Sequence, residues 1–150
     1  MRLVVALSVA AVAVAGASAS SVPSGLIVFS SNDGTGGGTR VWVMRANGAG
    51  RHAVTPAAAD AVMPAVSADG RRIAYVRRGD VYTVGSNGSH VRRLTSGGAT
   101  KGMPAWSPNR RWIAYSSYSS GRSSIWKMRS NGRRKTRLFF FFLKKQDYKV

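Results

Sequence analysis

The chain contains no cysteine among its 150 residues. This absence excludes disulfide bonds, a thiol nucleophile, thiolate metal ligands and a lipid-modified cysteine near the N-terminus. A fold without such cross-links must be held together by its hydrophobic core. The pattern of apolar residues therefore decides which fold the chain can adopt.

Acidic residues are also scarce, with no glutamate and only five aspartates. Scattered aspartates supply neither a catalytic carboxylate pair nor the oxygen cage that a hard metal needs. The glycine-rich segment 33–38 lacks the G-x-x-x-x-G-K-[ST] phosphate loop, and no G-x-S-x-G nucleophile elbow occurs. His52 and His90 follow Asn-Gly pairs at comparable places, which indicates inherited turn positions rather than a ligand pair. The sequence predicts no catalytic residue, no metal and no cofactor, and hence no enzyme.

Positive charge dominates instead, because 23 Lys and Arg give a net charge of +18. Such a charge attracts polyanions, whether nucleic acid, anionic lipid or acidic envelope polymer. The basic residues cluster beside expected turns and outer strands, at Arg71-Arg72, Arg92-Arg93, Arg110-Arg111 and 133–137. These clusters have two interpretations, a solvated face that discourages strand pairing at a sheet edge or a polyanion-binding stripe. Aromatic residues do not interleave with them, so no specific nucleic-acid partner is expected.

The first 19 residues have the pattern of a secretory signal peptide. Arg2 supplies the positive start, residues 3–15 are apolar apart from Ser8, and Ala17-Ser18-Ala19 fits the small-x-small cleavage pattern. A transmembrane anchor is the alternative, but a spanning helix needs about 20 apolar residues and this run is shorter. We therefore expect cleavage after Ala19, a linker over residues 20–25, no transmembrane segment in the mature chain, and a secreted or periplasmic location.

The chain repeats itself with a period of about 40 residues, which is typical of propellers and solenoids. The stretch MPAVSADGRRIAY, residues 63–75, returns as MPAWSPNRRWIAY, residues 103–115. A second motif occurs three times, as VWVMRANG from Val41, VYTVGSNG from Val81 and IWKMRSNG from Ile125. In each copy an aromatic lies five positions before the Asn-Gly pair, and an aliphatic lies six positions after its glycine.

Both repeated motifs predict antiparallel hairpins. The Asn-Gly pairs indicate type I′ turns, which need positive φ at both central residues, because Asn tolerates this conformation and Gly adopts it freely. The flanking runs are β-branched and aromatic, as half-buried strands prefer. The segments 67–70 (SADG) and 107–110 (SPNR) predict the tight turn of the other hairpin, with Pro108 at its first corner.

Two such hairpins in succession make a four-stranded antiparallel meander, which is the size of one propeller blade. The predicted fold is therefore all-β, with β-propeller blades at 26–55, 62–95 and 103–138. The first blade lacks its first strand. The result is an incomplete ring of about two and three-quarter blades, whereas closed propellers have about 4–8.

The order MPAWSP, IAYSS, IWKMRSNG resembles the TolB-like, WD40-like β-propeller repeat, and the resemblance extends over residues 26–138. Trp106-Ser107-Pro108 matches that repeat's W-S-P, Asp69-Gly70 keeps its D-G, and Leu94-Thr95 keeps its L-T. Two positions depart, since Val66-Ser67-Ala68 replaces W-S-P in one unit and Asn109-Arg110 replaces D-G in the other. The resemblance implies a binding platform, either an envelope protein of the TolB kind or the lid domain of a prolyl-oligopeptidase-like serine peptidase.

Residues 139–150 differ from everything upstream. Phe139 stands where the repeat has threonine, and the tail FFFFLKKQDYKV contains neither W-S-P nor D-G. We interpret it as an atypical tail produced by a frameshift or truncation, which resequencing of the coding DNA would test. A buried strand and a membrane-surface anchor are the alternative interpretations of the phenylalanine run. Because apolar runs aggregate and open sheet edges pair, we expect self-association rather than a stable monomer.

The candidate binding residues lie on the rim that carries the loops between second and third strands and between blades. Variable loops on a rigid scaffold commonly carry binding. The candidate contacts are Asn32, Asp33, Arg77, Arg78, Asp80, Lys101, Tyr118 and Arg122. The alternative is a set of solvated loops that bind nothing.

Three functions remain open at this point. The first is a non-catalytic exported binding or scaffold protein whose propeller loops contact protein or an anionic envelope polymer. The second is the N-terminal propeller, or lid, of a serine peptidase that lacks its catalytic domain; a G-x-S-x-G motif coded downstream would identify it. The third is an anion-binding surface protein, which a steep salt dependence of binding would identify.

Overall fold

The computed structural model describes residues 25–32 and 38–142. Every regular element in these ranges is a β-strand, and the strands form three antiparallel sheets. The predicted all-β class is therefore confirmed. The expected signal peptide, nearly all of the linker, Asp33 and residues 143–150 lie outside the described residues.

Each sheet is a meander of strands that follow one another in the chain. The first sheet contains β1 (Leu26–Asn32), β2 (Thr39–Arg45) and β3 (His52–Ala53); the second contains β4 (Ala61–Val66), β5 (Arg72–Arg77), β6 (Asp80–Gly85) and β7 (Arg92–Arg93); the third contains β8 (Thr100–Trp106), β9 (Trp112–Ser119), β10 (Arg122–Arg129) and β11 (Thr136–Phe142). The last strand, β11, runs through the first four residues of the segment expected to be an atypical tail.

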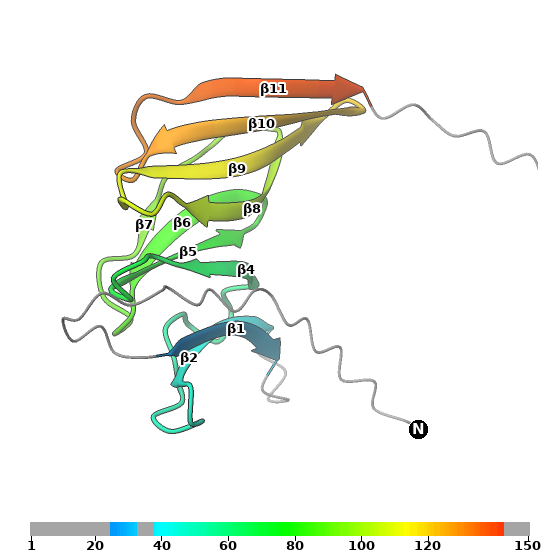
Figure 1. Cartoon of the computed structure of the whole chain (residues 1–150). Coiled ribbons are helices and arrows are strands. Elements are labelled where there is room, and N and C mark those ends of the chain that lie inside the picture. Colours follow the sequence, from blue (N-terminus) through cyan, green and yellow to red (C-terminus); the bar gives the residue numbers. More distant parts are fainter. Residues whose placement is uncertain (1–24, 33–37, 143–150) are drawn as a thin grey trace, which may run out of the picture.

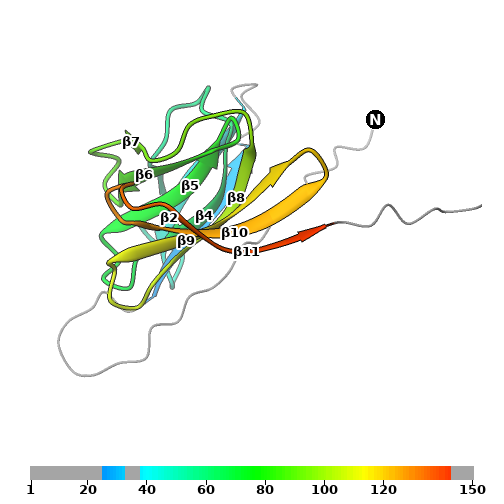
Figure 2. The same ribbon diagram turned by 90° about the horizontal axis from the view of Figure 1, so that it is seen from above.

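The three sheets stack face to face, in the manner of propeller blades (Figure 1). The first strand of each complete blade makes the contact with the blade before it, because β4 packs on β1 and β2, and β8 packs on β4, β5 and β6. From above, the sheet of β8 to β11 overlies the other two (Figure 2). The described residues thus form an open part of a propeller, not a closed ring.

Two apolar clusters fill the spaces between the sheets. The cluster between the first and second sheets includes Val41, Val43, Val54, Ile73 and Tyr75, and the cluster between the second and third includes Val81, Leu94, Ile113, Tyr115 and Met128. Successive side chains of a strand point to opposite faces, so Ile73 and Tyr75 of β5 enter the first cluster while Ala74 enters the second. The middle sheet is therefore buried on both faces.

The exposure of the aliphatic residue six positions after each Asn-Gly glycine shows whether the next blade covers that part of the sheet. Val54 is 4% exposed and Leu94 is 5% exposed, whereas the equivalent Leu138 is 54% exposed. The turn of the next blade covers the first two, since a Cβ on Gly88 would lie 3.6 Å from the Val54 carbonyl oxygen and one on Gly132 would lie 3.1 Å from that of Leu94. Among the described residues, no turn covers Leu138.

The threonine of the L-T motif closes the outer edge of a blade. The Thr55 hydroxyl accepts the Val41 N–H at 2.9 Å, and the Thr95 hydroxyl accepts the Val81 N–H at 2.9 Å. A buried backbone N–H without a partner is costly, so this hydroxyl explains why the repeat has threonine there. Phe139 occupies the equivalent position in the third blade and has no hydroxyl.

The Asn-Gly turns differ from the predicted type I′ geometry. Positive φ occurs at Gly48, Gly88 and Gly132 but at none of the three preceding asparagines. Instead each asparagine Oδ1 accepts the backbone N–H two residues further on, at 3.0 to 3.1 Å. The connections are longer than a two-residue hairpin loop, and a second positive-φ residue completes each one, namely Gly50, His90 and Arg134. The hairpins are confirmed, and their turn type is wrong.

The first turns of the second and third blades share one design. In SADG, the Ser67 hydroxyl donates to Asp69 Oδ1 at 2.6 Å; in SPNR, the Ser107 hydroxyl donates to Asn109 Oδ1 at 2.8 Å. The fourth residue has positive φ in both turns, 69° at Gly70 and 58° at Arg110. Asn109 thus reproduces the turn bonds of the aspartate, while Arg110 adopts a backbone conformation that favours glycine.

Candidate binding surfaces

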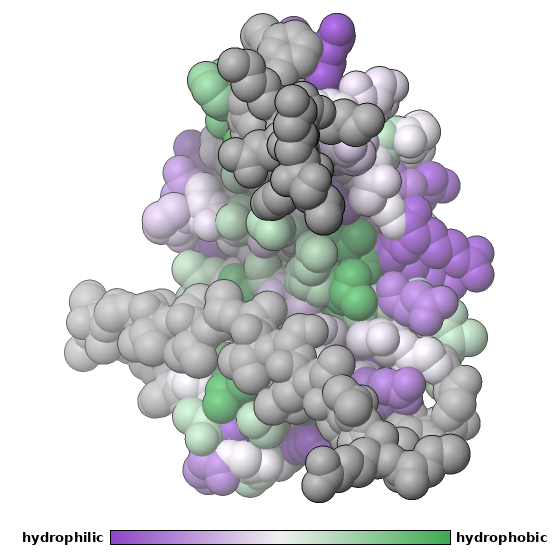
Figure 3. All heavy atoms as spheres, turned by 90° about the vertical axis from the view of Figure 1, so that its right-hand side faces the viewer, coloured by the Kyte–Doolittle hydropathy of each residue, from purple (hydrophilic) through white to green (hydrophobic). Residues whose placement is uncertain are grey.

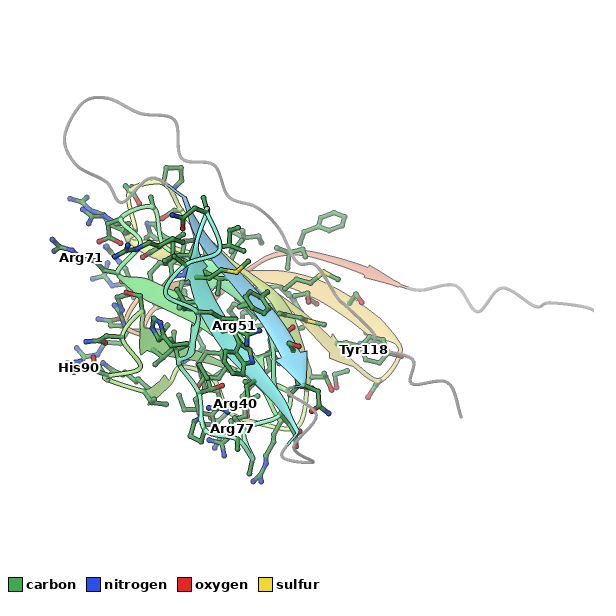
Figure 4. The ribbon with its side chains drawn as sticks, turned by 90° about the horizontal axis from the view of Figure 1, so that it is seen from below. Arg40, Arg51, Arg71, Arg77, His90 and Tyr118 are labelled. Carbon is green, nitrogen blue, oxygen red and sulfur yellow. The ribbon has the colours of Figure 1, made fainter. Side chains whose placement is uncertain are left out.

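The connections between strands form two rims at opposite ends of the sheets. The tight rim is the set of loops 46–51, 67–71, 86–91, 107–111 and 130–135; the loop rim, as far as it is described, is Gly38 with the loops 54–60, 78–79, 94–99 and 120–121. Arg71 and His90 lie on one side of the molecule, at the tight rim, and Tyr118 lies on the other side, near the loop rim (Figure 4). Hydrogen bonds from Ser86 N–H to the Arg71 carbonyl and from Ser130 N–H to the Arg111 carbonyl join the tight turns within each complete blade.

Four of the predicted contact residues are exposed at or beside the loop rim. They are Asn32 at the end of β1, Arg78 in the β5–β6 turn, Tyr118 near the end of β9 and Arg122 at the start of β10. Tyr118 is 47% exposed, which is high for an aromatic residue. These side chains come from all three blades, and the fold brings them to one rim because each lies at the same end of its sheet.

Arg77 is half-buried, in contrast to its neighbour Arg78. Its guanidinium lies 6.0 Å from the centre of the Tyr82 ring, and its Nε is buried without a hydrogen-bond partner among the described residues. Another candidate, Asp33, lies outside the described residues.

Asp80 and Lys101 are buried and face each other across the junction of the second and third blades. Lys101 Nζ lies 3.2 Å from Asp80 Oδ1, and each side chain is 7% exposed. Arg93 Nη2 lies 2.5 Å from Asp80 Oδ2, and the Thr95 hydroxyl donates to Oδ1 at 2.8 Å. Lys101 also donates to the carbonyls of Ser96 and Gly97. The pair clamps two blades together beneath the rim.

The electrostatics of this clamp favour the charged carboxylate. Burial raises the pKa of Asp80, but hydrogen bonds from Arg93, Thr95 and Lys101 and the charge of Lys101 outweigh it, so the pKa lies below its usual range. Both ions are thus satisfied by partners within the protein, as buried charges require. The contact between blades therefore explains why these two charged side chains are buried, and no ligand is needed to explain it.

A second junction pair lies on the tight rim. Arg110 Nη1 lies 2.6 Å from Asp69 Oδ2 and joins the first turns of the second and third blades. Burial raises the pKa of Asp69, but hydrogen bonds from Ser67, Arg110 and the Arg71 N–H lower it to about 2. A shallow hollow of about 260 Å³ lies beside the pair. Its lining residues are Ser67, Asp69, Arg72, Trp106, Asn109 and Arg110.

Cations lie over the indole rings of three partly buried tryptophans, which the sequence did not reveal. The Arg72 guanidinium lies 5.5 Å from the centre of the Trp106 ring. The guanidiniums of Arg40 and Arg51 lie 5.0 and 5.4 Å from the centre of the Trp42 ring. Lys127 Nζ and the Arg129 guanidinium lie 5.0 and 4.5 Å from that of Trp112. Cation–π contacts of this kind stabilise a fold by about 0.5–1 kcal/mol at exposed sites. They also occupy ring faces on which a ligand could stack.

The histidines and aspartates of the described ranges form no cluster that could hold a metal ion. His52 lies in a turn contact instead, with Nε2 3.1 Å from the Ser86 carbonyl oxygen of the next blade. No helix long and apolar enough to cross a membrane occurs in the part of the chain that the structure describes. Figure 3 shows the face on the right of Figure 1, where hydrophilic side chains gather along one side.

Repeated four-stranded meanders, stacked through their first strands and joined by short turns, define a β-propeller protein. The family model described as the TolB beta propeller domain matches residues 13–146. The chain therefore belongs to the TolB beta propeller family, and the expected resemblance is confirmed.

Solved structures support the fold assignment. TolB of Agrobacterium tumefaciens is 24% identical, with a TM-score of 0.66 over 77% of this chain and 43% of that one. TolB of Acinetobacter baumannii is 20% identical, with a TM-score of 0.67 over 79% of this chain and 31% of that one. The β-propeller domain of the Trilobed protease from Pyrococcus furiosus is 13% identical, with a TM-score of 0.54 over 81% and 40%. The chain thus spans less than half the length of these structures, and no curated protein matches it.

Proposed function

We propose that the chain is a non-catalytic binding or scaffold protein that works outside the cytoplasm and contacts protein or envelope polymer through its loop rim. One observation carries the proposal: exposed Asn32, Arg78, Tyr118 and Arg122 come from three blades and lie at one rim of a rigid stack of sheets. Function on such scaffolds usually resides in the loops. Membership of the TolB beta propeller family supports a binding role.

The loop-rim variant R78A/Y118A/R122A tests this proposal. The matched control is R45A/R92A/M103A, which removes two exposed arginines and one exposed apolar residue from strands outside both rims. Each protein is immobilised and exposed to a cell-envelope extract, and bound protein and bound polymer are quantified separately. We expect retention to fall at least fivefold for the loop-rim variant and less than twofold for the control. Equal retention by all three proteins would overturn the proposal.

Export rests on the signal-like residues 1–19 and agrees with the TolB relatives. Expression of the full chain with fractionation of the cells tests it directly. We expect the mature chain in the periplasm or medium, beginning at Ser20 by N-terminal sequencing. An intact N-terminus in the cytoplasmic fraction would contradict this location.

A second candidate function is the propeller lid of a serine peptidase. The similarity to the propeller domain of the Trilobed protease favours it. Sequencing of the DNA past the last codon separates the two functions. A continuous reading frame with further blades and a G-x-S-x-G motif would favour the peptidase, whereas its absence would favour the binding protein.

We also propose that the 150-residue chain associates with itself through uncovered blade faces. Leu138 and Phe139, 54% and 62% exposed, mark such a face on the third sheet. Their counterparts in the first two blades are covered by the next blade. Burial of one leucine stabilises a contact by about 1.5–3 kcal/mol, so a second chain gains by covering this face.

A further inference from the structure

The tight rim concentrates positive charge, and the loop rim does not. The loops of the tight rim contain seven basic residues, all exposed: Arg51, Arg71, Arg110, Arg111, Arg133, Arg134 and Lys135. The same loops contain a single acid, Asp69. Within the described part of the loop rim, Arg78 is the one basic residue and Asp60 the one acid. The charge is thus directed to one end of the molecule.

Most of this charge has no partner within the described structure. Arg110 forms the ion pair with Asp69, and Lys135 Nζ donates to the Gly132 carbonyl at 2.6 Å. Neither Arg71, Arg111, Arg133 nor Arg134 forms an ion pair within the described ranges. Their guanidiniums remain free to bind anions. A row of like charges this close together is unfavourable unless counterions or a ligand neutralise it.

Two of these arginines, both in the third blade, have a positive φ, a backbone conformation that favours glycine. Arg134 has φ 52° where the first blade has Gly50 at φ 67°, and Arg110 has φ 58° where the second blade has Gly70 at φ 69°. An arginine in this conformation is strained, whereas glycine is not. Strained residues of this kind cluster at functional sites, and the second blade has another at the position of Arg134, namely His90 at φ 55°. Since Arg110 already pairs with Asp69, Arg134 is the clearer case.

Hydrogen bonds in the turns fix the backbone at and beside these arginines. The Arg129 N–H donates to the Arg133 carbonyl at 2.8 Å, and Asn131 Oδ1 accepts the Arg133 N–H at 3.1 Å. The Ser130 N–H donates to the Arg111 carbonyl at 3.0 Å, which places the two basic turns of the third blade side by side. The equivalent bond from Ser86 to Arg71 joins the first turn of the second blade to turn 86–91, which contains no lysine or arginine. The Arg110–Asp69 pair joins the first turns of the two blades, so the basic turns 67–71, 107–111 and 130–135 form one row.

We propose that this row is a second binding surface, separate from the loop rim, for a linear polymer that bears phosphate groups. Arginine suits phosphate because its planar guanidinium donates two parallel hydrogen bonds. The surface lacks features that other polyanions need. Arg51 lies over Trp42, Arg72 over Trp106 and Arg129 over Trp112, so cations already occupy the ring faces on which bases could stack there. Val91 is the one large exposed apolar residue in these loops, too little for insertion into a membrane.

The proposal takes from the proposed function only that the chain is a binding protein. A matched pair of variants tests it, because Arg78 on the loop rim has φ 48° and Arg134 on the tight rim has φ 52°. R134G and R78G each remove one charge, and each relieves a strained backbone, but on opposite rims. The probe is long-chain inorganic polyphosphate, titrated against the full chain at several salt concentrations.

We expect R134G to weaken polyphosphate binding about three- to tenfold and to reduce the slope of log Kd against log salt by about 1. R78G should change Kd less than twofold. Both variants should unfold at temperatures equal to or above that of the parent chain, so weaker binding by R134G cannot reflect unfolding. A larger variant pair extends the comparison: R71Q/R111Q/R133Q against R78Q/R92Q/R122Q, with three charges removed in each.

Equal effects of the two variants in either pair would overturn the proposal, since net charge alone would then attract the polymer. Tighter binding of a single-stranded oligonucleotide than of polyphosphate with the same number of charges would also overturn it, because only base contacts could supply the difference. Neither result bears on the loop-rim assay with envelope extract. The two proposals can therefore fail separately.

Discussion

At the scale of single residues, chemistry within the turns explains both motif matches and motif departures. Asn109 replaces an aspartate yet keeps its turn bonds, because the turn uses only one side-chain oxygen. Asp69 uses its second oxygen to bind Arg110 of the next blade. The aspartate of the motif thus has two tasks, one inside its own turn and one between blades.

The D69N substitution separates these tasks. The lowered pKa of Asp69, about 2 against 3.8, means that its ionisation stabilises the fold above pH 4 and that this stabilisation is lost as the pH falls toward 2. Because Arg110 is 53% exposed, we discount the effect of the pair to about 1 kcal/mol. We expect D69N to unfold about 1 kcal/mol more easily at pH 7 and equally at pH 2, by urea titration at one fixed protein concentration. The control D60N should change little, and a D69N deficit that persists at pH 2 would contradict the ion-pair explanation.

Several residue roles could not be predicted from the sequence. Asp80 and Lys101 are 21 positions apart in the chain, and nothing local in the sequence indicates that they meet between blades. The free charge of the tight rim also depends on packing, because basic turns 20 to 60 positions apart become neighbours only in the folded sheets. Exposed Tyr118 and Arg122, by contrast, follow from their place beside a hairpin loop.

At the scale of strands and turns, hydrogen-bonding side chains close each blade. Thr95 accepts the Val81 N–H and donates to Asp80, so its hydroxyl joins the outer strand to the clamp between blades. Thr55 repeats the first of these bonds in the first blade. The L-T motif is therefore a structural requirement of the meander.

The T95V substitution tests this role while it preserves side-chain shape. Loss of the hydroxyl leaves a buried N–H and a carboxylate oxygen each without one partner, so we expect unfolding to become easier by about 1–3 kcal/mol. T136V is the control, since Thr136 is exposed on β11. Its effect should stay within about 0.5 kcal/mol. Equal effects of T95V and T136V in urea titrations would contradict the assignment.

The existence and order of strands could be predicted from the sequence, but their irregularities could not. Alternation of apolar residues and the two turn motifs located the hairpins of all three blades. The type I′ assignment was wrong because the Asn-Gly dipeptide does not report loop length. The sequence also did not predict the bulges in the first strands of the second and third blades. In β4 and β8, Met63 and Met103 adopt positive φ at the register shifts, and a methionine in a sequence does not predict this conformation.

At the scale of the whole molecule, each blade is stable only when a neighbour covers its face. The second sheet is covered on both sides, while the third sheet exposes Leu138 and Phe139. Units of a repeat protein depend on such neighbour contacts, and stability is roughly the sum of unit and interface terms. The number of sheets could be predicted from the repeat, and the degree to which each is covered required the structure.

The L138D substitution tests whether the third sheet carries the contact between chains. A charge on this face should weaken self-association about tenfold or more, because it removes the burial of one leucine. V91D is the control, since Val91 is 50% exposed but lies on the tight rim. Sedimentation velocity over a range of protein concentrations gives the dissociation constants. An equal effect of both substitutions would place the contact elsewhere.

Amide hydrogen exchange, measured strand by strand at low and high protein concentration, tests the stacked-blade architecture most directly. At low concentration we expect β5 and β6 to exchange slowest, and β10 and β11 markedly faster, because only the middle sheet is covered on both faces. At high concentration the protection of β10 and β11 should rise toward that of β5 and β6. Uniform protection of all three sheets at every concentration would contradict the dependence of each blade on its neighbour.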